Sequence, residues 1–163
     1  MHASDLPGRL DACLQQEIET GGRLLDALRR EHRALVAQDP AALDEIIVQK
    51  ASLVATMESC GTERSALLRQ TGLGGDRNGM ETLLRQYDPQ GRGNLRRGWA
   101  RLLELGAECQ RQNLINGIII QAGQQQTRQA LAILRGQPAA AGGEYGPEGR
   151  RHSTPSSHPL AKA

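Results

Sequence analysis

Aliphatic residues recur at alternating steps of three and four along the first part of the chain, and this spacing constrains the fold more than any other feature. Between residues 5 and 38 the repeating positions are Leu10, Leu14, Ile18, Gly21, Leu25, Leu28 and Leu35, with His32 in the same register. Such steps keep apolar side chains on one side of an α-helix and are typical of a coiled-coil seam. Pro7 suits the first turn of a helix, where its missing N–H costs nothing. A long helix is therefore predicted over residues 5–38.

A second helix is predicted to follow almost without a connection. It opens at QDPAAL, where Asp39 is a good N-cap and Pro40 takes the first helical position. Its seam is Leu43, Ile46, Lys50, Leu53, Met57, Cys60, Arg64 and Leu67. The near absence of a connection predicts an antiparallel helical hairpin. Lys50 and Arg64 lie at seam positions, and we expect their stems to cover apolar surface while their charges reach water.

The rest of the chain predicts two more helices and a tail. Asn78, followed three residues later by Glu81, resembles a capping box for a short helix over residues 80–87. The longest periodic stretch covers residues 95–135. Residues 136–163 are rich in Gly, Pro, Ser and Ala and are expected to be disordered. The predicted fold is all-α: a long antiparallel hairpin, a short helix and a long C-terminal helix form one bundle over residues 5–135.

Composition excludes several classes of partner and location. The chain has one Trp, two Tyr and no Phe, so its core must use aliphatic side chains packed along narrow seams. Twenty basic against eighteen acidic side chains argue against a nucleic-acid partner. No apolar run reaches the ~18 residues that span a membrane, and the N-terminus lacks the pattern of a signal peptide. We therefore expect a cytoplasmic protein without stable membrane insertion.

No group of residues predicts catalysis, a cofactor or a metal. Cys13, Cys60 and Cys109 are far apart and odd in number, and no CxxC occurs, so neither a disulfide framework nor a zinc site is expected. His2 and His32 have no Ser, Cys or carboxylate at a recognisable spacing, and the HExxH pattern is absent. The sequence therefore predicts no catalytic residue, no cofactor and no metal site, and favours a binding role over an enzymatic one.

The stretch NLINGIII, residues 113–120, makes the long helix apolar almost all round. At ~100° per residue, several aliphatic side chains point away from the helix seam. We expect these residues to contact a partner: Leu114, Ile115, Ile118, Ile119 and Ala122. The short third helix or a second copy of the chain could cover the same side chains, and the sequence leaves these alternatives open.

A polar face runs beside these aliphatic residues on the same helix. Asn113, Asn116, Gly117 and Ile120 share it with Cys109 and Gln124. A buried asparagine in a helical seam costs stability but selects register and partner. Gly117 permits close helix approach and weakens the helix by about 1 kcal/mol relative to Ala. We expect Asn113, Asn116, Gly117 and Ile120 to set helix packing and register.

The sequence resembles the FlgN family of flagellar export chaperones. The matching features are the hairpin segment DPAALDEIIVQKASLVATME, the run C-x-x-x-N-x-x-N-G from Cys109 to Gly117 followed by IIIQ, and the small length with a loose tail. The resemblance covers roughly residues 5–135, and N-x-x-N-G is its most specific part.

The resemblance implies an all-helical cytoplasmic protein without catalysis. Such chaperones bind hook-associated proteins, which form the hook–filament junction, and deliver them to the type III export gate. The family's client-binding region corresponds to residues 112–135 here. A chaperone of this kind is expected to be a monomer or a weak homodimer. The alternative is a self-associating coiled-coil scaffold or adaptor without an export role.

Overall fold

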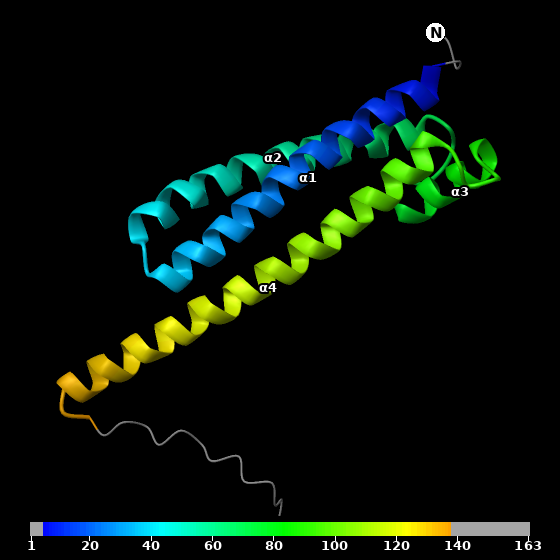
Figure 1. The fold of residues 1–163 in the computed structure, drawn as a ribbon. Helices are drawn as coiled ribbons and strands as arrows, with labels where there is room; N and C mark the ends of the chain where they lie inside the picture. The colour runs from blue at the N-terminus through cyan, green and yellow to red at the C-terminus, as the bar shows by residue number, and fades with distance from the viewer. Residues whose placement is uncertain (1–4, 138–163) are drawn as a thin grey trace, which may run out of the picture. The chain divides into compact units, whose positions relative to one another are not determined.

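The computed structural model describes residues 5–137, which form four helices and no strand. They are α1 (Leu6–Ala37), α2 (Pro40–Arg69), α3 (Arg77–Tyr87) and α4 (Asn94–Leu134) (Figure 1). The all-α prediction is confirmed. The described residues fall into two units, with the division between Gln124 and Gln125. The predicted disordered tail, residues 136–163, lies mostly outside the described residues.

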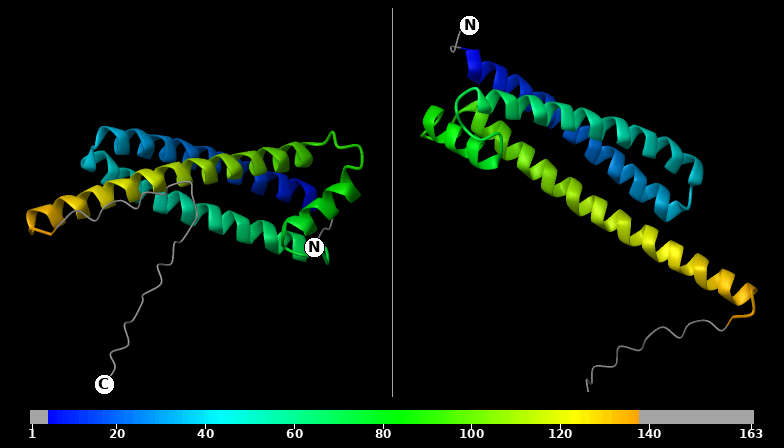
Figure 2. Two further views of the ribbon diagram at one scale, coloured as in Figure 1. Left: turned by 90° about the horizontal axis from the view of Figure 1, so that it is seen from below. Right: turned by 180° about the vertical axis from the view of Figure 1, so that it is seen from behind.

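Helices α1 and α2 form the predicted antiparallel hairpin, and they lie side by side in each view of Figure 2. Gln38 closes α1 with a left-handed backbone, φ 53°, and only Asp39 separates it from α2. The Asp39 carboxylate accepts a hydrogen bond from the Ala42 N–H at 3.1 Å, and Pro40 opens the helix as predicted. The chain therefore reverses direction within two residues.

Helix α3 begins earlier than predicted, and with a different cap. Asp76, rather than Asn78, is the N-cap, and its carboxylate accepts from the Gly79 N–H at 2.9 Å. Glu81 does not close a capping box and instead accepts a hydrogen bond from Trp99 Nε1 at 2.9 Å. Gly79 is required here because a Cβ at this position would overlap the Gly74 carbonyl.

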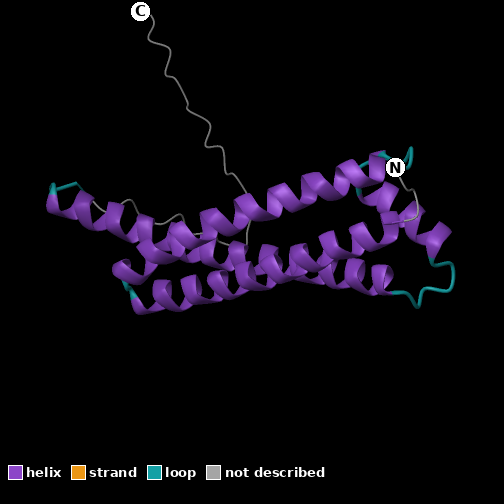
Figure 3. Cartoon of the chain, turned by 90° about the horizontal axis from the view of Figure 1, so that it is seen from above, coloured by secondary structure: helices purple, strands orange, loops and turns teal. Residues whose placement is uncertain are grey.

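The main core lies where the start of α1, the end of α2, helix α3 and the start of α4 meet. The connections on both sides of α3 lie at this end as well (Figure 3). Trp99 is the only aromatic residue of the buried cluster, and aliphatic side chains supply most of the remainder, as the composition predicted. The cluster comprises Leu10, Cys13, Leu14, Leu67, Leu68, Met80, Leu83, Leu84, Trp99 and Leu102.

A buried ion pair crosses the hairpin beside this core. Arg64 Nε lies 2.8 Å from Glu17 Oε1, and both side chains are largely buried. The Arg64 guanidinium also lies over the Trp99 ring, 5.1 Å from its centroid. The expectation that Arg64 and Lys50 extend their charges into water is therefore wrong. Both residues pair with buried glutamates of α1, because an unpaired carboxylate there would be costly to desolvate.

Alkaline pH is expected to destabilise this fold through Cys13. Burial, followed by the neighbouring Glu17 carboxylate, raises the pKa of the Cys13 thiol from 9.0 to about 11. The folded protein thus holds this proton more tightly than the unfolded chain does. The resulting stabilisation is full below pH 9 and is lost as the pH rises through 11. Between pH 9 and 11, the free energy of unfolding in urea should fall less steeply with pH in Cys13→Ala than in the wild type. Equal slopes in the two proteins would contradict the role given to Cys13.

Candidate protein-binding surface on helix α4

Helix α4 packs along α1 and runs in the same direction. Near its start, a Cβ at Gly98 would lie 3.7 Å from a methyl group of Leu14. About two turns further on, a Cβ at Gly21 would lie 3.7 Å from Leu105. Cys109 Sγ follows, 3.8 Å from the Gly21 carbonyl oxygen. At Gly98 and Gly21, the glycine of one helix therefore lies against a leucine side chain of the other.

A buried polar layer joins α4 to the hairpin and is centred on Asn116, which is 1% exposed. Asn116 Nδ2 donates to the Leu28 carbonyl at 2.9 Å and to Glu31 Oε2 at 2.8 Å. Its Oδ1 accepts from Gln112 Nε2 at 3.1 Å. Lys50 Nζ lies 2.9 Å from Glu31 Oε1, so the layer joins α1, α2 and α4. Each of these polar groups has a partner, which is the condition for a buried network to be stable.

The aliphatic residues expected to contact a partner mostly face solvent. Leu114 and Ile118 are 66% and 58% exposed, and Ile115 is 45% exposed. Leu114 and Ile118 each lie two residues from Asn116, which turns them roughly 160° away from the face that packs on α1. Ala122 is also exposed. We call Leu114, Ile115, Ile118 and Ala122 the α4 stripe; Ile119, the fifth expected residue, is half-buried.

The residues expected to set packing and register differ in their surroundings. Asn116 lies in the packing face, whereas Asn113 is exposed and Ile120 is 41% exposed. Gly117 is half-buried, and a Cβ there would meet no heavy atom within 4 Å. The face that packs on the hairpin therefore passes through Cys109, Asn116 and the half-buried Ile119.

The part of α4 in the second unit, described by itself, is also exposed. Leu131, Ile133 and Leu134 present large apolar surface to solvent. Gly136, with φ 73°, follows the helix, and the Gln137 N–H donates to the Ala132 carbonyl at 2.9 Å. This bond satisfies a carbonyl that the helix end would leave without a partner.

A second exposed apolar surface lies on α2, and the seam pattern of this segment did not predict it. Ile47 and Val48 are 54% and 71% exposed, and Val54 is 40% exposed. Val48 lies two residues from the buried Ile46, on the far side of the helix from α1. The available signal was the presence of aliphatic residues off the predicted seam of this segment.

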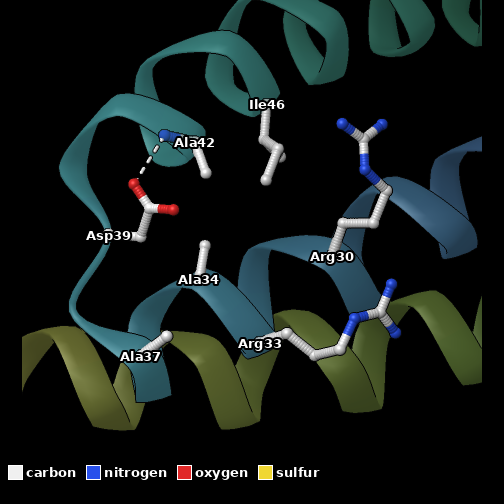
Figure 4. Close-up of a pocket in the computed structure, with 7 residues that line it drawn as sticks. All are labelled: Arg30, Arg33, Ala34, Ala37, Asp39, Ala42 and Ile46. Atoms are coloured by element: carbon white, nitrogen blue, oxygen red, sulfur yellow. Dashed lines mark hydrogen bonds between the residues drawn. The ribbon is translucent and has the colours of Figure 1, made fainter.

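A pocket of about 330 Å³ opens near the turn of the hairpin (Figure 4). Alanine methyl groups and Ile46 form much of its wall, and Arg30, Arg33 and Asp39 add charge. Arg30 Nη1 donates to Gln49 Oε1 at 2.7 Å, and Asp39 caps α2. Two of the three charged groups are therefore already engaged within the protein.

The described residues hold no group of three or more His, Cys, Asp or Glu side chains that could bind a metal. Among the same residues, no helix is both long enough and apolar enough to span a bilayer. The exposed apolar faces of α4 and α2 are therefore the candidate site.

Comparison with known proteins identifies the family. The sequence profile described as FlgN protein matches residues 1–153. The crystal structure of a flagella synthesis protein FlgN from Pseudomonas aeruginosa is similar, with 29% sequence identity and a TM-score of 0.60. That alignment covers 74% of this chain and 90% of the Pseudomonas chain. No curated protein matches the chain. Because the profile covers most of its length, this protein belongs to the FlgN family.

Proposed function

We propose that this protein is a cytoplasmic flagellar export chaperone. It binds hook-associated proteins through α4, prevents their premature aggregation and delivers them to the type III export gate. Membership of the FlgN family and the similarity to a flagella synthesis protein support this role. The role requires no catalytic residue, cofactor or metal.

The observation that carries the proposal is the α4 stripe. Its aliphatic side chains lie opposite the face that packs on α1, and within the described residues nothing covers them. Contiguous exposed apolar surface of this kind marks an interaction site. A client helix with an apolar face could bury the stripe, gaining about 25 cal/mol per Å² less the cost of ordering both partners.

Asn116 supports the same proposal by fixing the orientation of the stripe. Its hydrogen bonds to Leu28 and Glu31 hold one rotation of α4 about its axis. The residues two positions on either side are thereby directed to solvent. If α4 turned about its axis by the angle of one residue, about 100°, other side chains would face solvent. The polar layer would thereby select the surface that the client meets.

The test is a mass measurement by light scattering on the purified protein, alone and mixed with hook-associated proteins from the same source. We expect a discrete complex. Leu114→Asp/Ile118→Asp should weaken binding by about 100-fold or more, because each carboxylate would be desolvated in the interface. Ile119 is left unchanged because it is half-buried, and its replacement would disturb packing.

Val36→Asp is the matched control, since Val36 is as exposed as Leu114 but lies on α1. It should bind clients normally, and all variants should keep their helicity by circular dichroism. If the double variant binds clients as tightly as Val36→Asp does, the stripe is not the binding site. If the chain forms a stable homo-oligomer that ignores these clients, the scaffold alternative is favoured instead.

A further inference from the structure

The exposed apolar surface of α2 has its own charged border. We call Ile47, Val48, Ala51 and Val54 the α2 patch; these residues are exposed and lie off the helix face that carries the buried Ile46 and Leu53. Asp44 precedes the patch and Glu58 follows it, and both are exposed. The one lysine within this segment, Lys50, is paired with Glu31. The border that a partner would meet is therefore acidic.

The α4 stripe has the opposite character. Between residues 109 and 124, Arg111 is the only charged residue, and the segment contains no acid. Arg111 is exposed and lies one turn before Leu114 and Ile115, so it borders the stripe. The two surfaces also match in length: residues 44–58 and 111–122 span roughly 20 Å and 16 Å of helix.

We propose that the α4 stripe of one copy of this chain docks on the α2 patch of a second copy. The contact is made twice, because each copy carries both surfaces, and the dimer closes about a two-fold axis. Arg111 of each copy meets the acidic border of the other. Apolar burial supplies the affinity, and the charges set the pairing of α4 with α2 rather than of α2 with itself.

Such a dimer has a consequence for client binding, which rests on the proposed function. The α4 stripe is covered in the dimer and free in the monomer, so a client and a second copy compete for it. A dimer would then protect the stripe when no client is present, and client binding would release monomers.

The test measures the dimer dissociation constant by sedimentation equilibrium of the full chain. Val48→Asp and Ile118→Asp should each raise this constant at least about tenfold, and Val36→Asp should leave it unchanged. Mixing Val48→Asp with Ile118→Asp should restore dimers, because one of the two contacts then joins an unaltered stripe to an unaltered patch. A mixture no more dimeric than its components, or a wild-type chain that stays monomeric, overturns the inference.

Charge exchange gives a second, independent readout. Arg111→Glu should weaken dimers, and Asp44→Arg/Glu58→Arg mixed with it should strengthen them relative to either protein alone. Client binding separates this inference from the proposed function. Val48→Asp leaves the α4 stripe intact and should bind hook-associated proteins at least as tightly as the wild type. If Val48→Asp weakens the dimer and neither it nor the wild type binds hook-associated proteins, the inference is supported and the chaperone role is refuted.

Discussion

Replacing Arg64 by methionine is expected to lower the free energy of unfolding by about 3 kcal/mol. Arg64 pairs with Glu17 at 2.8 Å, and the Glu17 side chain is only 3% exposed. Methionine would fill most of the space but leave this carboxylate buried without its cation. The contact of the guanidinium with the Trp99 ring would be lost as well. Urea denaturation followed by circular dichroism measures the change.

Adding Glu17→Gln to Arg64→Met is the control. The double variant removes both charges, and replacing a buried pair by neutral groups costs far less than removing one partner. We expect it to recover most of the lost stability. If the double variant is no more stable than Arg64→Met, then packing against Trp99, and not the unpaired charge, accounts for the loss.

Replacing Asn116 by aspartate is expected to destabilise the packing of α4 on α1 by about 3 kcal/mol. The amide of Asn116 donates to two acceptors, the Leu28 carbonyl and the Glu31 carboxylate. A carboxylate has no proton to donate and would repel Glu31 across a distance of about 3 Å. Hydrogen exchange should become faster in α4 from Gln112 onward, while the hairpin retains its protection.

The rescue for this variant is Glu31→Gln. The new amide can donate to the introduced carboxylate, and Lys50 still has an anion nearby because it lies in the same layer. We expect slow exchange in α4 to return in the double variant. Equal acceleration in α2 and α4 after Asn116→Asp would instead mean that the layer stabilises the whole bundle and not the position of α4.

The helices were predictable because a spacing of three and four residues leaves few other folds. The two-residue turn followed from Asp39 and Pro40. The start of α3 was missed because Asp76 and Asn78 are both good caps, and the choice depends on the close approach of Gly79 to Gly74. That tertiary contact joins a loop to a helix and has no signature in local sequence.

The charged layers were missed for a different reason. Glu17 and Glu31 lie off the predicted seam of α1; both pair with bases of α2, and Glu31 also accepts a hydrogen bond from Asn116 of α4. A signal was present: Lys50 and Arg64 occupy seam positions with the same separation as the two glutamates. In an antiparallel hairpin, that separation predicts two ion pairs.

The rotation of α4 could be predicted only in part. A helix that is apolar almost all round does not reveal which face will pack. The asparagine at position 116 is buried and that at 113 is exposed, although both belong to the motif that supported the family resemblance. The difference arises because Glu31 supplies an acceptor to one of them, across a distance of 85 residues in sequence.

The two ion-paired layers lie two heptads apart on α1, and they lie two heptads apart on α2. If α1 slid past α2 by two heptads, only one glutamate would lie beside a basic residue. The other glutamate and the other basic residue would be buried without a partner. The same rule governs how the length of this protein can change during evolution. Between the layers, a deletion in one helix must be matched in the other, whereas the hairpin can grow or shrink freely at the turn that joins α1 to α2.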